Sequence, residues 1–487
     1  MNDKAKSYRN TALIAISSVI NILFSIIKNK FLAIFLGPSG IGLFSILNDF
    51  INTIFSVGSL GISNSGVQAI SKASTESKEE VKRVYNGLIF IYSILSIIFV
   101  AIICVFANPI SSHISQTTIS KESFAWILRV ASLTILFRFR SAIQSNLIIG
   151  MQRVGLLAKG TAIQGFIATI VGIVLAYFLG VKSIPFLVLS LGVASWAVTY
   201  FQSRKVLKEL PNNNNRLSFK QMKPIFIIGI ATTWSGLLET VVNLITKNSI
   251  INKFGENHLG YYTVAIGFTM QYISFITQSI TSDYYPRLVA TIAKGTNEVA
   301  RFVNQQIAIS MNLIMPLLFI MLTFSKLFLS ILFSPKFLPA NSLINYTVAG
   351  TFILVVAWPI AYVFLANRAT KTYITSELIG NSSLLLLNLG AIWLANFSFL
   401  GLAYVAHYVI YLTVIIYLFY KRFDGFIVKE NIKTFLLNAA IIAIIVVVKE
   451  IFIPAVTYTV GTLLIAMFFY ISRKEYAFMF NSVVKKR

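Results

Sequence analysis

Ionisable side chains inside long apolar runs are the residues of this chain that could do chemistry. Lys28 and Lys30 stand near the end of the first run, and Asp49 lies within the second. An ionisable side chain at membrane depth costs roughly 2.5–3.5 kcal/mol, so such residues usually face a bundle interior or a wet cavity. Two interpretations of Lys28 are open: an ion pair with Asp49 across the turn at Gly37, or a cavity position that binds an anionic group. Lys30, nearer the surface, extends toward water unless it joins the same site.

Two arginines, Arg138 and Arg140, lie near the middle of the fourth apolar run, in the segment LFRFRS. A spacing of two residues places them about 200° apart around a helix, so they cannot share one face. A guanidinium group holds phosphate or pyrophosphate by paired hydrogen bonds. We therefore expect at least one of the two to bind an anionic substrate.

Acidic residues also occur within apolar runs in the second half of the chain. Glu239 is interpreted either as an ion-pair partner for one of the basic residues or, like Asp49, as a cavity carboxylate that takes up and releases a proton. Asp283 and Arg287 are four residues apart and therefore share a helix face. They are candidates for an inner gate or for a simple interfacial ion pair.

The elements that position these residues are membrane-spanning helices. The 487 residues are 56% hydrophobic with a mean hydropathy of +0.78, more apolar surface than a soluble protein of this length can bury. The fold class is all-α, with two six-helix lobes and two C-terminal helices. Fourteen runs are long enough to span a bilayer: 10–36, 41–69, 84–108, 124–149, 157–179, 184–206, 223–252, 258–288, 302–333, 341–366, 372–396, 399–420, 432–450 and 455–472.

The charge is strongly basic, with 41 Lys and Arg against 16 Asp and Glu. In a soluble chain this excess would suggest nucleic acid, but here most Lys and Arg fall in alternate connections between spans, as the positive-inside rule requires. We therefore expect both termini on the cytoplasmic side and no nucleic-acid partner.

An internal repeat relates the first six spans to the next six. At a shift of 218 residues Gly37 matches Gly255, Gly42 matches Gly260, and the heptapeptide EVKRVYN at 80–86 matches EVARFVN at 298–304. Because an even number of spans separates the copies, the halves share one topology and are related by an axis along the membrane normal, so substrate would sit between them. The predicted domains are an N-lobe at 1–210, a cytoplasmic linker at 211–222, a C-lobe at 223–422 and an accessory region at 423–487.

The segment FLGPSGIGLF at 35–44, followed by SVGSLGISNSGVQAIS at 56–71, resembles the start of Wzx-type polysaccharide flippases. These belong to the multidrug/oligosaccharidyl-lipid/polysaccharide exporter (MOP) superfamily, with the MATE transporters and MurJ. The resemblance implies a V-shaped, MATE-like bundle. It also implies transfer of an undecaprenyl-pyrophosphate-linked oligosaccharide, such as an O-antigen unit of lipopolysaccharide, to the outer leaflet of the bacterial inner membrane. The implied partners are this anionic lipid-linked sugar, membrane lipid, a coupling H⁺ or Na⁺, and polymerase or chain-length proteins.

Two other functions compete with this interpretation. A MATE-like, ion-coupled drug exporter should have an acidic and aromatic site, whereas the span-interior charges counted here are six basic and four acidic: Lys28, Lys30, Arg129, Arg138, Arg140 and Lys326 against Asp49, Glu239, Asp283 and Glu377. An enzyme is disfavoured, because the acidic residues form no DxD motif and no His, Cys and acid cluster has metal-ligand spacing. We expect no catalytic residue, metal or cofactor.

Overall fold

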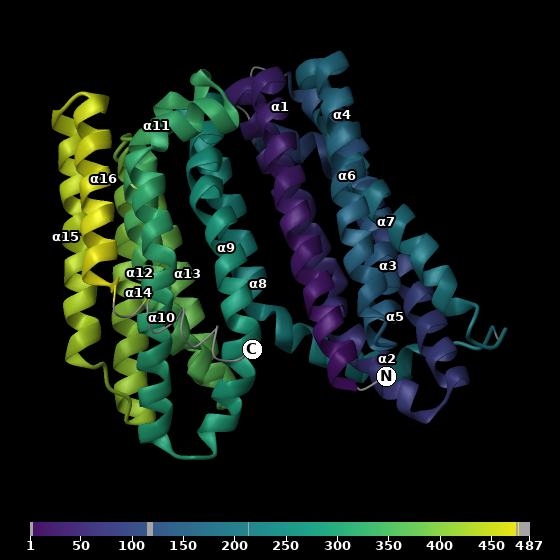
Figure 1. The fold of residues 1–487 in the computed structure, drawn as a ribbon. Coiled ribbons are helices and arrows are strands. Elements are labelled where there is room, and N and C mark those ends of the chain that lie inside the picture. Colours follow the sequence, from purple (N-terminus) through teal and green to yellow (C-terminus); the bar gives the residue numbers. More distant parts are fainter. Residues whose placement is uncertain (1–2, 114–119, 213, 474–475, 477–487) are drawn as a thin grey trace. The chain divides into compact units, whose positions relative to one another are not determined.

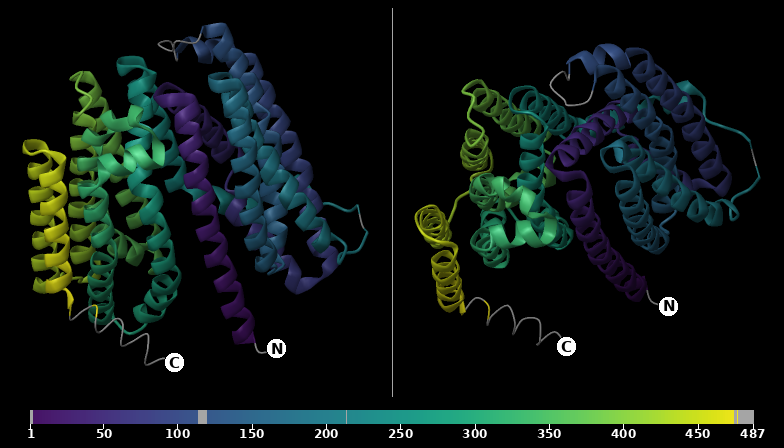
Figure 2. Two further views of the ribbon diagram at one scale, coloured as in Figure 1. Left: turned by 45° about the horizontal axis from the view of Figure 1, so that its top comes forward. Right: turned by 90° about the horizontal axis from the view of Figure 1, so that it is seen from above.

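Long helices form where the sequence has its apolar runs, because a helix satisfies its own backbone hydrogen bonds in lipid. The computed structural model describes residues 3–113, 120–212, 214–473 and 476. Contacts between residues divide the chain into unit 1 (Met1–Gly260 with Leu332–Ser334) and unit 2 (Tyr261–Ile331 with Pro335–Arg487). Figure 2 shows the helices of each unit running side by side.

The helices lie almost wholly within one unit or the other (Figure 1). Those of unit 1 are α1 (Asp3–Ser59), α2 (Ile62–Glu76), α3 (Lys78–His113), α4 (Lys121–Ser132), α5 (Thr134–Gly150), α6 (Val154–Leu179), η1 (Gly180–Ser183), α7 (Ile184–Leu207) and α8 (Phe219–Phe254). From there the chain continues through α9 (Glu256–Ile292), α10 (Thr296–Thr323), α11 (Ser325–Phe328), η2 (Leu329–Phe333), η3 (Pro335–Ala340), α12 (Asn341–Ala366), α13 (Thr370–Trp393), α14 (Phe399–Phe423), α15 (Lys429–Ile451) and α16 (Pro454–Ile471).

The all-α prediction is confirmed, since no strand occurs among the described residues. Eight helical segments in the described part of the chain are long and apolar enough to cross a membrane, and they cover ten of the fourteen predicted runs. The other four runs, 124–149, 223–252, 258–288 and 372–396, coincide with α4 and α5, α8, α9 and α13. The protein is a multi-pass membrane protein, and the count of fourteen spans stays a prediction.

Several helix interruptions fall inside predicted spans. The expected break at Gly37 is present, with φ of 68° splitting α1 into two helices. The run 41–69 is broken at Leu60 and Gly61, both with positive φ, and the run 124–149 is broken at Leu133 between α4 and α5. The run 302–333 is also interrupted, because α10 ends at Thr323 and short helical turns follow. These breaks span one or two residues, so averaged hydropathy does not detect them.

Helix α8 belongs to unit 1, where it packs on α1 and α2. The sequence assigned this helix to a C-lobe at 223–422, so the division by contacts falls one helix later than the proposed boundary. Two glycines matched by the repeat, Gly42 of α1 and Gly260 in the first turns of α9, lie close together in unit 1. A Cβ atom on Gly42 would lie 2.6 Å from the Glu256 carbonyl oxygen, and one on Gly260 would lie 2.0 Å from the Pro38 carbonyl oxygen. The chain segments at these two glycines therefore pack backbone to backbone.

We expect Gly260→Ala to destabilise the protein by about 1–3 kcal/mol, as overpacking does where the neighbouring atom cannot move aside. The neighbour here is the Pro38 carbonyl, a backbone atom. The measurement is thermal unfolding of the purified protein. Gly390→Ala in α13 is the control, because its Cβ would meet nothing within 4 Å and alanine favours a helix. Equal melting temperatures for the two variants would contradict the close contact.

The heptapeptides matched by the repeat form similar local structures in the two units. Glu80 pairs with Arg83 at 3.4 Å near the start of α3, and Glu298 pairs with Arg301 at 3.0 Å near the start of α10. Asn86 Nδ2 donates to the Asn215 carbonyl in the connection after α7, at 3.1 Å. The matching Asn304 donates to the Phe426 carbonyl after α14, at 2.7 Å. An equivalent asparagine therefore holds the connection after α7 in unit 1 and the connection after α14 in unit 2 by a hydrogen bond.

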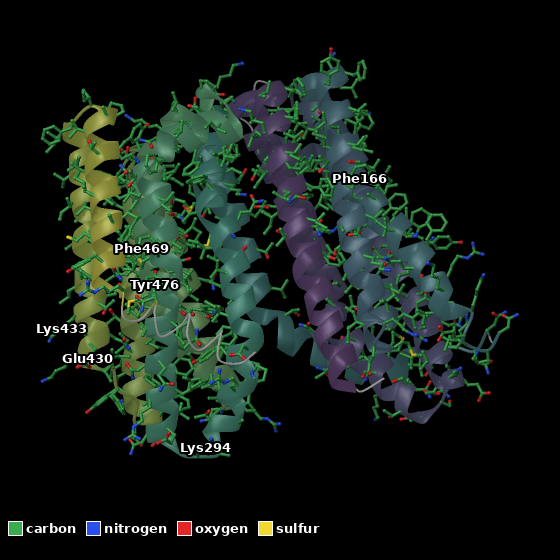
Figure 3. The ribbon with its side chains drawn as sticks, viewed as in Figure 1. Phe166, Lys294, Glu430, Lys433, Phe469 and Tyr476 are labelled. Carbon is green, nitrogen blue, oxygen red and sulfur yellow. The ribbon has the colours of Figure 1, made fainter. Side chains whose placement is uncertain are left out.

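Charged side chains gather at one end of unit 2 (Figure 3). Lys294 in the turn between α9 and α10, and Glu430 and Lys433 near the start of α15, are exposed at this end. These residues belong to connections that the sequence assigns to one side of the membrane. At the other C-terminal helix, α16, the ring of Phe469 lies tilted against that of Tyr476, whose hydroxyl donates to the Asn312 carbonyl of α10. That carbonyl would otherwise lack its usual helix donor, because residue 316 is a proline.

Candidate functional site

A polar cavity of about 640 Å³ lies in unit 1 between the second half of α1, α5 and α8. Helices α1 and α8 contact each other directly, and both contribute polar side chains at helical spacing. The charged and amide residues that line it are Asp49, Asn52, Arg138, Glu239 and Asn243. Three of the six residues proposed from the sequence for substrate binding or coupling therefore line one cavity.

Arg138 is held in this cavity without a carboxylate partner among the described residues. Its Nη1 donates to Asn52 Oδ1, and its guanidinium carbon lies 5.0 Å from the centre of the Phe55 ring. An amide and an aromatic face orient the guanidinium but leave its positive charge uncompensated. The guanidinium therefore keeps N–H donors that can bind an anion, whereas an ion pair with a carboxylate would occupy them.

A second polar cavity, of about 400 Å³, continues from the first on the other side of Arg138. The two cavities share Asn52, Phe55 and Arg138. The second is also lined by Ser141 and Ser195, whose hydroxyl oxygens are 2.6 Å apart. Arg138 thus stands where the two polar spaces meet.

Asp49 forms an ion pair with Lys247 of α8, and not with Lys28. The Lys247 Nζ to Asp49 Oδ2 distance is 2.7 Å, and both side chains are largely buried, at 14% and 20% exposed. Lys247 also donates to the Ser45 hydroxyl. Of the two interpretations of Lys28, the ion pair with Asp49 is therefore wrong, because the cation that pairs with Asp49 comes from a helix that begins only at Phe219.

Lys247 is the residue that sequence reasoning missed. It lies inside the predicted span 223–252 but was not counted among the span-interior basic residues, and Lys449 in α15 was missed in the same way. The available signal was a lysine five residues before the end of the apolar run 223–252. With both included, the excess of basic over acidic residues inside the spans increases.

The other predicted basic residues lie elsewhere. Arg140 is exposed and does not line either polar cavity, which agrees with the expected separation from Arg138 around the helix. The half-buried side chain of Lys28 lies against α6. Its Cδ would be 3.7 Å from a Cβ atom added to Gly172. Lys30 is half-buried on the same helix as Lys28. Substrate roles for these three residues stay predictions.

Glu239 reaches the cavity from α8 and makes no ion pair with a described residue. The interpretation that it balances Arg138, Arg140 or Lys28 has no support in the geometry. Asp283 and Arg287 do form the expected pair, at 2.9 Å, with side chains 72% and 63% exposed. A gating role for that pair stays a prediction. No metal-binding group of His, Cys, Asp and Glu occurs in the described part of the chain.

Comparisons with known proteins agree with this fold. A curated relative, the lipid III flippase of Escherichia coli (strain K12), is 22% identical over 432 residues, covering 84% of this chain and 97% of that protein. The lipid II flippase MurJ in an inward closed conformation superposes with a TM-score of 0.69 at 14% identity, over 96% of this chain and 99% of MurJ. An inward-facing MATE multidrug transporter of the MOP superfamily gives 0.61 at 14% identity, over 84% and 99%.

These relatives are flippases and transporters, not enzymes. The likeness to MurJ and to the MATE transporter shows that the chain shares their fold. The sequence model of one family, described as polysaccharide biosynthesis protein, matches residues 31–342, well over half of the chain. This match includes Asp49, Arg138, Glu239 and Lys247. The chain therefore belongs to the polysaccharide biosynthesis protein family.

Proposed function

We propose that the protein is a flippase for a lipid-linked anionic oligosaccharide. The substrate class is an O-antigen-like repeat unit on undecaprenyl pyrophosphate, moved from the cytoplasmic to the outer leaflet of the bacterial inner membrane. The proposal draws on the family match and on the relative named as a lipid III flippase. The observation that carries it is Arg138, a cation without a carboxylate partner among the described residues, inside a polar cavity of a membrane-spanning bundle.

With Glu239 protonated, the charges lining the cavity favour an anion over a cationic drug. Asp49 is already neutralised by Lys247, which leaves Glu239 as the carboxylate opposing Arg138. When Glu239 is protonated, the cavity has a net positive charge and attracts pyrophosphate. When it loses its proton, the added negative charge repels the bound anion. Proton exchange at Glu239 would thus couple substrate binding and release to the cycle.

We expect Glu239→Gln to bind substrate as the wild type does but to stop proton-driven translocation, because glutamine mimics the protonated carboxyl and cannot release a proton. The measurement is substrate binding and translocation by purified protein at two external pH values. Thr240→Ala, on the next residue of the same cavity wall, controls for loss of polar lining. Translocation by Glu239→Gln at the wild-type rate would show that another group or ion couples transport.

Reconstitution tests the proposed function directly. Purified protein in liposomes is loaded with a fluorescent undecaprenyl-pyrophosphate oligosaccharide, and its transfer between leaflets is followed by an impermeant quencher. The function predicts protein-dependent transfer that excess inorganic pyrophosphate inhibits. Transport of a cationic dye without transfer of the lipid-linked sugar would favour the MATE-like exporter.

A further inference from the structure

The two C-terminal helices of unit 2, α15 and α16, hold the end of α10. A Cβ atom on Gly461 of α16 would lie 2.3 Å from Cγ2 of Thr323, the last residue of α10. The ring of the next residue, Phe324, stacks on that of Tyr458 in α16, with centroids 5.2 Å apart. Both contacts fall where α10 stops and short helical turns begin, so the α15–α16 hairpin fixes this break.

Lys449 of α15 adds a buried charge at the same place. The residue is 8% exposed, and its ammonium group donates to Ser325 Oγ and to Asn345 Oδ1, each at 2.6 Å. Ser325 Oγ donates in turn to Asn341 Oδ1 at 2.7 Å. Because Ser325 begins α11 and Asn341 begins α12, one ammonium group joins the two ends of the segment between them.

That segment, residues 326–340, forms a strap of short turns: the rest of α11, then η2 and η3. The ring centroid of Phe328 lies 6.1 Å from that of Phe268 on α9. Near the other end of the strap, the ring centroid of Phe337 lies 6.4 Å from that of Tyr261, also on α9. η2 is a single π-helical turn, a geometry that is frequent at functional sites. Helical pieces this short are not stable alone, so side-chain contacts hold the strap in place.

We propose that the α15–α16 hairpin is a clamp that keeps the strap closed on α9, and that the strap opens as one piece when the clamp releases. Lys449 is the positioning residue of this clamp. Its ammonium group has its acceptors only while the two ends of the strap lie together, and a buried ammonium group without acceptors is costly. An apolar side chain would pack in several arrangements, whereas the lysine specifies one. The inference concerns unit 2 and does not depend on the proposed function.

Hydrogen–deuterium exchange on the full-length protein in phospholipid nanodiscs measures the opening of the strap. Lys449→Met keeps most of the side-chain volume but removes the donors. We expect it to raise exchange of the strap amides at least tenfold while exchange within α15 and α16 stays at the wild-type rate, because local opening leaves the rest of the fold intact. Lys433→Met is the matched control, since Lys433 is exposed on the same helix. Lys449→Arg retains the donors and should recover part of the protection.

Tyr458→Leu tests the clamp from its other helix. It removes the ring that stacks on Phe324 and should open the same strap amides, although the substituted residue lies on α16. Tyr470→Leu is its control, because Tyr470 is 65% exposed on that helix. If Lys449→Met does not reach the membrane, Tyr458→Leu decides the question alone.

Faster exchange confined to the strap supports the clamp. Wild-type exchange of the strap in both Lys449→Met and Tyr458→Leu overturns it, as does an equal rise in the Lys433→Met control. Faster exchange that spreads through α10 and α12 also overturns it, because the hairpin would then only stabilise unit 2 as a whole. Opening by Tyr458→Leu with full protection in Lys449→Met would remove Lys449 from its positioning role.

Discussion

Arg138→Ala is expected to lower translocation of the lipid-linked substrate at least tenfold while the protein still reaches the membrane. Arg138 is a cavity cation whose partners are an amide and an aromatic ring, so its removal takes away charge-assisted contacts to the anion. Each such contact contributes about 1.5–3 kcal/mol, and about 1.4 kcal/mol corresponds to a factor of ten in rate. The measurement is complementation of a flippase-null strain, with the amount of membrane protein checked.

Arg140→Ala provides the matched control, because Arg140 is two residues away on α5, exposed, and outside both polar cavities. Arg138→Lys should recover part of the activity, since the point charge is retained while the paired geometry of the guanidinium is lost. Wild-type surface polysaccharide from an Arg138→Ala strain would remove the electrostatic basis of the proposed function. An equal loss in Arg140→Ala would show that the effect comes from α5 as a whole.

Lys247→Ala is expected to destabilise the folded protein by about 3–5 kcal/mol, because it leaves the carboxylate of Asp49 buried and unpaired. The pair is largely buried, and the Ser45 hydroxyl completes it. Thermal unfolding of the purified protein measures the effect. The double variant Lys247→Ala with Asp49→Asn should recover most of the lost stability, since no uncompensated charge remains.

The exposed Asp283–Arg287 pair is the comparison for this experiment. Its side chains are more than 60% exposed, so Arg287→Ala should change stability by at most about 1 kcal/mol. A Lys247→Ala variant that melts with the wild type would mean that the Asp49 carboxylate is hydrated or protonated. Failure of the double variant to recover would mean that Lys247 acts through packing or through Ser45.

Helix positions were predictable because membrane spans are set by length and apolar content, which are local properties. The separation of Arg138 from Arg140 followed in the same way from the helical repeat. Which of the two faces a cavity could not be derived, because that depends on how α5 packs on α1 and α7. The partner of Asp49 could not be derived for a related reason. Proximity across the Gly37 turn made Lys28 one open interpretation, whereas the cation comes from α8, and nothing local to Asp49 encodes that contact.

The ion pair between α1 and α8 also has a consequence for how the chain is made. Asp49 and Lys247 are 198 residues apart (247 − 49), so at a synthesis rate of 5–20 residues per second, about 10–40 s pass between the emergence of Asp49 and of its cation. During that interval Asp49 is in the nascent bundle without this partner. When α8 arrives, its lysine faces the same cost of entering lipid, and pairing relieves both costs together. The buried ion pair of unit 1 therefore forms only after α8 has been synthesised.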